Sequence, residues 1–178
     1  RHSFPTRRSS DLLRASVRQI VLKDRSKPIE WLTPLGFPVL QPYWNQHRMR
    51  VKTSVSPWDL IIEVPNEDDD QHLGRNVNGI APNWVHSIDA SHMMLTALRC
   101  RVDGIDFAAV HDSFWTHAGT AAQLSDALRS EFVALHEKPL LADLRERWQR
   151  HYNVSLPELP KQGSLDLSVV RKSKYFFA

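Results

Sequence analysis

Residues 83–101, NWVHSIDASHMMLTALRCR, set the architecture that the rest of the chain can adopt. Asn83 is a residue type that caps helices, and apolar or small residues come after it at spacings of three and four. These residues are Trp84, Ile88, Ser91, Leu95 and Leu98. The spacing predicts a helix from Asn83 to about Arg101 that packs along one face.

After a glycine-containing turn, residues 107–118 are FAAVHDSFWTHA. We expect two strands, Ile105–Val110 and Ser113–His117, with His111 and Asp112 at the bend between them. If the strands bury their apolar side chains, the bend presents one carboxylate from a rigid edge, which suits a hard cation such as Mg²⁺. One carboxylate does not complete such a site, and an aspartate in a turn commonly serves only its own backbone. From these residues alone, both interpretations stay open.

The remaining segments predict further helices and short strands. A short amphipathic helix is expected over residues 13–24. Four prolines between residues 28 and 42 forbid a helix and favour two strands, Ile29–Leu32 and Phe37–Gln41. Helices are predicted over 120–137 and 139–151, and residues 47–75 look like a solvated hairpin with a disordered tip. The expected fold class is α+β, mostly helical, with a short antiparallel β-hairpin that carries Asp112.

Composition sets limits on the class of protein. The chain has 178 residues, a formal net charge of +3 and a pI of about 9.2. This mild basic excess is compatible with a polyanionic partner without requiring one. The single cysteine, Cys100, excludes an internal disulfide and a cysteine-based zinc cluster. No apolar run approaches the roughly 20 residues that a membrane span needs, so we expect no membrane partner.

The first twelve residues, RHSFPTRRSSDL, differ in character from the rest of the chain. They have no initiator methionine, no apolar centre of a signal peptide and no clear amphipathic period. We expect residues 1–12 to be non-native and the natural unit to span residues 13–178.

The predicted helix raises the question of a metal site. His86 and Asp89 share one helical face, whereas His92 lies on a different side. Zinc-binding helices place histidines at positions i and i+4, and this pair does not have that spacing. A lone helical histidine is more often a structural or surface residue, and His86 is also suited to contact a base edge or sugar of a nucleic acid.

Four blocks of the sequence, in order, resemble the C-terminal part of the single-subunit, phage-type RNA polymerases. The blocks are WLTPLGFPVLQPY (31–43), GIAPNWVHSIDASHMMLTAL (79–98), FAAVHDSFWTHA (107–118) and the ending LPELPKQGSLDL…SKYFFA (156–178). The mitochondrial branch is the nearer one, and the resemblance covers about residues 14–178. It implies that residues 13–178 are the C-terminal palm and fingers part of a DNA-directed RNA polymerase.

The resemblance also implies roles for single residues. Asp112 would be the Mg²⁺ ligand in two-metal nucleotidyl transfer, and His111 would lie close to the RNA 3′ end. The block PNWVHS makes His86 the expected contact in the minor groove of the template–product duplex. The terminal Phe176, Phe177 and Ala178 would lie close to the nucleotide site.

The implied partners are a DNA template, the RNA product and ribonucleoside triphosphates, with mitochondrial transcription factors as further candidates. Residues 49–74 correspond in order to a hairpin that contacts promoter DNA in the phage enzymes. Arg50 and Arg75 are therefore expected nucleic-acid contacts. The implied location is the mitochondrion, with the plastid as the alternative.

The family also needs a second palm aspartate, and a fingers helix with a lysine for the triphosphate and a tyrosine that excludes deoxynucleotides. We find no counterpart of these residues here. We therefore expect a piece of a larger polymerase that makes no RNA alone, binds Mg²⁺ weakly and is poorly soluble or partly unfolded. Two alternatives stay open. One is a helical interaction domain in which Asp112 only shapes a turn, and the other is a non-catalytic nucleic-acid-binding module that uses Arg48, Arg50, Lys52 and Arg75.

Overall fold

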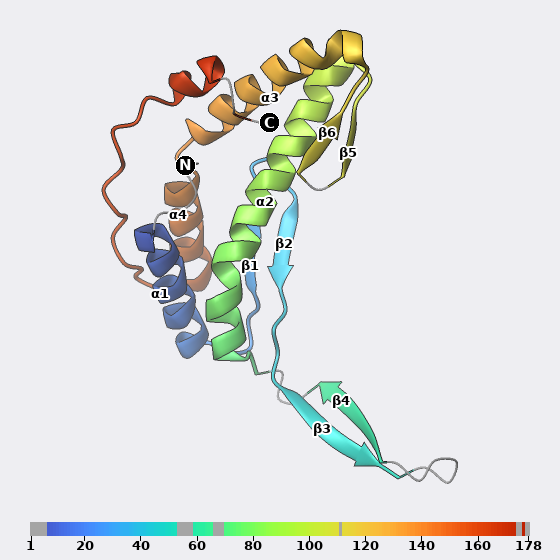
Figure 1. Cartoon of the computed structure of the whole chain (residues 1–178). Coiled ribbons are helices and arrows are strands. Elements are labelled where there is room, and N and C mark those ends of the chain that lie inside the picture. The colour runs from blue at the N-terminus through green and yellow to red at the C-terminus, as the bar shows by residue number, and fades with distance from the viewer. Residues whose placement is uncertain (1–6, 53–58, 66–69, 111, 174–175, 177–178) are drawn as a thin grey trace.

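The computed structural model describes the chain except residues 1–6, 53–58, 66–69, 111, 174–175 and 177–178. The described part of the chain combines helices with three small two-stranded antiparallel sheets (Figure 1), so the predicted α+β class is confirmed. The elements are α1 (Arg7–Lys23), β1 (Ile29–Leu32), β2 (Pro38–Gln41), β3 (Gln46–Val51), β4 (Leu60–Pro65), α2 (Leu73–Val102), β5 (Ala108–Val110), β6 (Ser113–Trp115), η1 (Ala118–Thr120), α3 (Ala121–His136), α4 (Leu140–Tyr152) and η2 (Leu167–Lys172).

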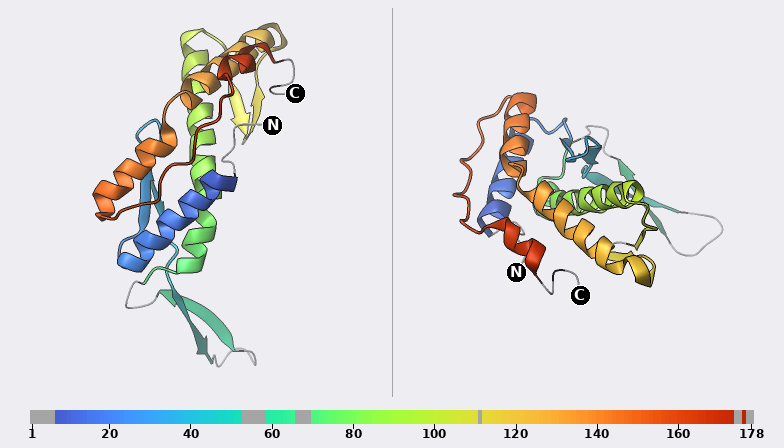
Figure 2. Two further views of the ribbon diagram at one scale, coloured as in Figure 1. Left: turned by 90° about the vertical axis from the view of Figure 1, so that its left-hand side faces the viewer. Right: turned by 90° about the horizontal axis from the view of Figure 1, so that it is seen from above.

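Helix α2 runs through the length of the body, and the other elements are arranged along it (Figures 1 and 2). It begins at Leu73 and not at Asn83, so the predicted start was wrong. Asn-Gly and Pro82 suggest a turn, yet Pro82 lies inside the helix, where it removes one backbone hydrogen bond. The N-terminus is capped by His72, whose Nδ1 accepts from the Arg75 N–H at 3.2 Å. No helix in the described part of the chain is both long and apolar enough to cross a membrane.

A buried polar network ties the first half of α2 to the end of β2. Gln41 is 2% exposed, and its Nε2 donates to the backbone and side-chain oxygens of Asn76 at 3.0 and 2.9 Å. Asn83, expected to be a cap, instead donates to Gln41 Oε1 at 2.9 Å and to the Tyr43 hydroxyl at 3.1 Å. Gly79 lets Tyr43 approach, because a Cβ there would lie 2.7 Å from the ring. These contacts offset the hydrogen bond lost within the helix.

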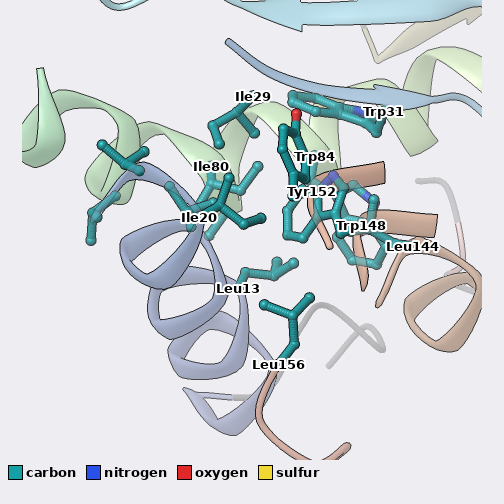
Figure 3. Packing of buried hydrophobic residues seen from close by; sticks show 14 of the residues in the cluster. Leu13, Ile20, Ile29, Trp31, Ile80, Trp84, Leu144, Trp148, Tyr152 and Leu156 are labelled. Atoms are coloured by element: carbon teal, nitrogen blue, oxygen red, sulfur yellow. The ribbon is translucent and has the colours of Figure 1, made fainter. Parts of the chain in front are cut away.

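The larger hydrophobic cluster lies between α1, β1, the first half of α2 and α4 (Figure 3). Trp31 and Trp148 are among its largest members, each 1% exposed. Helix α1 begins at Arg7, before the predicted residue 13, and Leu12 is buried. The helix therefore continues into the segment expected to be non-native, whose origin stays a prediction.

Hydrogen bonds from two aromatic side chains of α4 fix strand β1. The Trp148 Nε1 donates to the Glu30 carbonyl at 2.7 Å. The Tyr152 hydroxyl donates to the Pro28 carbonyl at 2.7 Å and accepts from the Glu30 N–H at 3.0 Å. Burial raises the pKa of Tyr152 to about 12, so it remains a donor at any physiological pH. The predicted β1–β2 hairpin is thereby joined to a helix more than a hundred residues away.

A smaller hydrophobic cluster lies where the second half of α2 meets α3 and the β5–β6 hairpin. Its buried residues, with the two partly buried phenylalanines that pack on them, are Cys100, Ile105, Leu124, Ala127, Leu128, Phe107 and Phe114. Leu98, predicted to face inward, is 54% exposed because Thr96 and Cys100 take the inward positions here. The predicted helices over 120–137 and 139–151 are confirmed as α3 and α4, within one residue at each end.

Strands β3 and β4 form an arm (residues 46–65) that projects from the body (Figure 1). Both faces are solvated, and Met49 and Ile61 are 54% and 59% exposed. The arm is joined to the body by an antiparallel bridge between Trp44 and Gln71. The acidic stretch PNEDDDQHLG (65–74) belongs to the segment predicted as a hairpin with a disordered tip. Gln71 in it is 1% exposed, so this end is built into the body, and residues 66–69 lie outside the described residues.

Candidate active site

The candidate catalytic aspartate lies in the turn of the β5–β6 hairpin. The strands pair Ala108 with Trp115, Ala109 with Phe114, and Val110 with Ser113, which leaves His111 and Asp112 as a two-residue connection. Asp112 is exposed, and no hydrogen bond or ion pair within the described part of the chain occupies its carboxylate. His111 lies outside the described residues.

The hairpin is shorter and less buried than predicted. Its strands span three residues each, and Val110 and Trp115 are 58% and 51% exposed. The expectation that the strands bury their apolar side chains was therefore only partly right. The reason is that one face alone, with Ala109 and Phe114, is turned toward the body. That inner face must hold the turn in place.

Helix α2 presents a second carboxylate toward the same region. Asp89 is exposed, and partial desolvation is the main cause that raises its pKa. The negative charge of Asp112 raises the pKa of Asp89 further, while His86, His92 and His136 act to lower it. The charge of Asp112, in the hairpin, therefore reaches Asp89, on α2.

His86 is exposed on α2 at the rim of a groove of about 450 Å³. The groove lies between α2 and the β1–β2 hairpin, and its lining includes Trp31, Phe37, Asn83, Ser87 and Met94. An apolar floor beside an exposed imidazole suits the edge of a base or sugar better than a phosphate. The structure therefore leaves the predicted contact role of His86 sterically open.

His92 does not share this solvent-facing position. It is 6% exposed, and its Nε2 bonds to the Leu128 carbonyl at 2.9 Å. Burial lowers the pKa of its imidazole. The structural role expected for a lone helical histidine is confirmed at this position. Among the residues that the structure describes, no three His, Cys, Asp or Glu side chains gather into a metal site.

For Mg²⁺, the exposed Asp112 carboxylate is a suitable hard oxygen ligand, but it is insufficient by itself. The described residues therefore fit part of a magnesium site and not a complete one.

Arg50 and Arg75 lie in the arm and at the start of α2, away from the β5–β6 hairpin, which lies beside the second half of α2 (Figure 1). Arg50 is exposed on β3 in the arm, and Arg75 is exposed in the first turn of α2. Arg75 Nη1 donates to Gln46 Oε1 at 3.4 Å, a weak contact at the base of the arm. The structure thus places these two predicted nucleic-acid contacts on other elements than Asp112, with Arg75 about three turns from His86 along α2.

Phe177 and Ala178 lie outside the described residues. Their neighbour Phe176 is 8% exposed and packs edge to face on Phe132 of α3, with ring centroids 4.8 Å apart. Phe132 also stacks on His136 at 4.0 Å. Amphipathic spacing predicted Phe132 on the packed side of this helix, whereas its contact with His136 was missed, although their i, i+4 spacing was a signal for it.

Comparisons with known proteins agree with the resemblance. Residues 5–156 match the profile of a family described as DNA-dependent RNA polymerase. The chain is 43% identical over 158 residues to "DNA-directed RNA polymerase 3, chloroplastic" of Nicotiana sylvestris, covering 88% of this chain and 16% of that protein. It is 42% identical over 158 residues to "DNA-directed RNA polymerase 1, mitochondrial" of Arabidopsis thaliana, with the same shares.

A third relative is much shorter. "DNA-directed RNA polymerase 1A" of Nicotiana tabacum is 41% identical over 158 residues, which cover 88% of this chain and 99% of that protein. The chain thus spans about a sixth of the two longer relatives and nearly all of this one. The longer relatives are named for two organelles, the chloroplast and the mitochondrion.

Proposed function

The chain belongs to the DNA-dependent RNA polymerase family of the single-subunit, phage type, and from this premise we propose that it supplies the metal-binding turn for DNA-directed RNA synthesis. The observation that carries the proposal is Asp112, an exposed carboxylate in the two-residue turn of the β5–β6 hairpin. A second aspartate, a lysine and a tyrosine from elsewhere in a longer polymerase would complete the centre.

In this proposal, each residue near the turn has a separate task. When bound, Mg²⁺ activates the attacking 3′-hydroxyl and stabilises the departing pyrophosphate. Asp112 supplies one oxygen ligand from its turn, and His111 lies beside the RNA 3′ end. His86, on the rim of the groove, contacts the minor groove of the template–product duplex. The terminal Phe177 and Ala178 lie near the incoming nucleotide.

The proposed partners are those that the same chemistry requires: a DNA template, the RNA product and ribonucleoside triphosphates. The exposed arm contacts DNA, with Arg50 on β3 and Arg75 at its base as cationic contacts. The proposed location is the mitochondrion, with mitochondrial transcription factors as accessory partners. The plastid is the alternative, because relatives named for the chloroplast are equally similar.

The test replaces the metal ligand in a complete enzyme. A full-length polymerase carrying this segment is built by exchanging it for the matching residues of the Arabidopsis thaliana relative. Asp112→Asn should abolish RNA synthesis and leave DNA binding nearly unchanged, because the amide keeps the shape of the side chain but loses its charge. Synthesis is measured by primer extension across a Mg²⁺ titration.

Asp106→Asn is the matched control, since Asp106 is also exposed near this hairpin but pairs with His117 at 3.1 Å. This control should retain synthesis. If Asp112→Asn synthesised RNA as well as Asp106→Asn, the metal-ligand role would be excluded, and a non-catalytic nucleic-acid-binding role for the segment would be favoured.

A further inference from the structure

His92 lies where three elements meet beside the candidate active site. It projects from α2, and its Nε2 is 2.9 Å from the Leu128 carbonyl of α3. A carbonyl oxygen only accepts hydrogen bonds, so Nε2 carries the hydrogen and the tautomer is fixed. The bond joins residues 36 apart in the sequence and holds the imidazole in one orientation.

The same ring contacts two phenylalanines edge to face. Its centroid is 5.6 Å from that of Phe132 on α3 and 6.4 Å from that of Phe114 on β6, with interplanar angles of 85° and 76°. Phe114 lies on the inner face of the hairpin opposite Ala109. The imidazole therefore touches the hairpin two residues from Asp112.

The hairpin keeps its orientation through contacts of its inner face and its ends with the body. A two-stranded hairpin with three residues in each strand is at best marginally stable in water by itself. Its outer face is solvated, so its position depends on the inner face. There Phe114 meets His92 on one side and Phe107, with centroids 6.0 Å apart, on another.

We propose that His92 is a positioning residue for Asp112. Its hydrogen bond to α3 fixes the imidazole, and the fixed imidazole supports Phe114 and so sets where the turn presents the carboxylate. This inference rests on the proposed function, because it assigns His92 a part in the reaction through Asp112. Loss of this support displaces the carboxylate from the metal, and a displacement of about 1 Å can cost on the order of a hundredfold in rate.

The test compares variants in the full-length polymerase that carries this segment. His92→Leu keeps the bulk and removes the donor, and Phe114→Leu removes the ring contact while leaving the α2–α3 bond intact. Both should lower kcat by about tenfold or more and raise the Mg²⁺ concentration needed for half-maximal activity, with KM for the nucleotides little changed. His92→Gln keeps a donor of similar reach and should recover much of the loss.

Thr96→Val is the matched control. Thr96 is fully buried one turn further along α2, and its Oγ1 donates to the His92 carbonyl at 2.9 Å. This variant also loses one buried hydrogen bond, but it keeps both the His92–Leu128 bond and the His92–Phe114 ring contact. It should therefore lower stability without changing the Mg²⁺ requirement.

A second readout does not depend on activity. Hydrogen exchange of residues 105–117, followed by mass spectrometry, should be faster in His92→Leu and Phe114→Leu than in Thr96→Val. Unchanged exchange together with an unchanged Mg²⁺ requirement in His92→Leu would overturn the inference. If His92→Leu does not fold, Phe114→Leu decides, and an unchanged Mg²⁺ requirement there overturns it equally.

The two proposals fail in different ways. Active Asp112→Asn would remove the proposed function, while the exchange measurement would still report whether His92 holds the hairpin. If Asp112→Asn makes no RNA but His92→Leu has normal activity and a normal Mg²⁺ requirement, the proposed function is supported and the positioning role of His92 is excluded.

Discussion

Among single residues, Tyr152 makes the most consequential polar contacts in the larger cluster. Its hydroxyl joins α4 to both Pro28 and Glu30 and is the only group in the described residues that connects those two backbone positions. Tyr152→Phe should therefore lower the free energy of unfolding by about 1–3 kcal/mol, since the Glu30 N–H loses its partner in a half-buried site. Urea unfolding of the chain at low protein concentration measures the change.

Tyr43→Phe provides the comparison for that prediction. The Tyr43 hydroxyl accepts one hydrogen bond, from Asn83, and the residue is only half-buried. Its loss should cost less than the loss of the Tyr152 hydroxyl. If both changes lower the free energy of unfolding equally, the Tyr152 contacts with β1 stabilise the fold no more than the single Tyr43 hydrogen bond does.

The residues also show where sequence reasoning reaches its limit. The flanking strand patterns predicted the position of Asp112 in a two-residue turn, and helical spacing put His86 and Asp89 on one face, which the structure shows to be exposed. The burial of His92 was not predictable in detail, because its partner Leu128 lies on a different helix. A sequence pattern gives the face of a helix but not the carbonyl that a distant element brings to it.

At the level of elements, the arm offers the clearest test of nucleic-acid binding. Arg50 and Arg75 are exposed at its face and base. If each contacts a phosphate, each Arg→Ala change should reduce the slope of log K against log salt concentration by about one. Fluorescence anisotropy with duplex DNA in the full-length polymerase measures this slope.

A charge change elsewhere serves as the control for the arm. Arg150 is exposed on α4 and pairs with Glu146 at 3.6 Å. Arg150→Ala alters the net charge equally and should leave the slope unchanged. A slope that fell equally in all three variants would indicate a general charge effect and not a contact by the arm.

The elements were predicted well where local signals agreed and poorly where tertiary contacts compensated for a local defect. Prolines and alternating residues marked β1 and β2 correctly, and amphipathic spacing marked α3 and α4. The start of α2 was missed because Gly79 and Pro82 look like a break in the sequence. The packing of Tyr43 on Gly79 and the Gln41–Asn76 bonds stabilise a helix that local propensity disfavours.

At the scale of the whole molecule, the junction of α2 and α3 should be sensitive to acid. Burial lowers the pKa of both His92 and His136 below their ordinary value of 6.5. The unfolded state then binds protons first as the pH falls, so their neutral, packed forms stabilise the fold above about pH 6.5 and that stability is lost below it. The raised pKa of Asp89 has the opposite effect on stability. The folded state binds this proton before the unfolded state does, so Asp89 stabilises the fold as the pH falls further.

Hydrogen exchange of residues 124–136, corrected for the intrinsic pH dependence, should therefore accelerate between pH 7.5 and pH 5.5. His136→Gln, which cannot be protonated in this range, should flatten the response. An equally steep response in that variant would assign the effect to other groups.

The exposed apolar surface predicts how the chain behaves by itself. The groove beside α2 includes Phe37 and Leu40, which are 56% and 54% exposed, and the arm adds Met49 and Ile61. Residues of this chain alone form both hydrophobic clusters, so we expect the chain to stay folded. Its exposed apolar side chains should then cause self-association. Light scattering at micromolar concentration should show oligomers, and a stable monomer would contradict this expectation.

The continuity of α2 has a further consequence. One uninterrupted helix of 30 residues, about 45 Å long, carries the arm at its start, and its second half packs against the β5–β6 hairpin that follows it in sequence. It works as a ruler, because inserting or deleting a single residue would rotate everything past that point by about 100° and shift it by about 1.5 Å. Insertions or deletions within this helix should therefore abolish RNA synthesis by a polymerase that carries this segment. Extra residues between β3 and β4 should leave that synthesis largely unchanged.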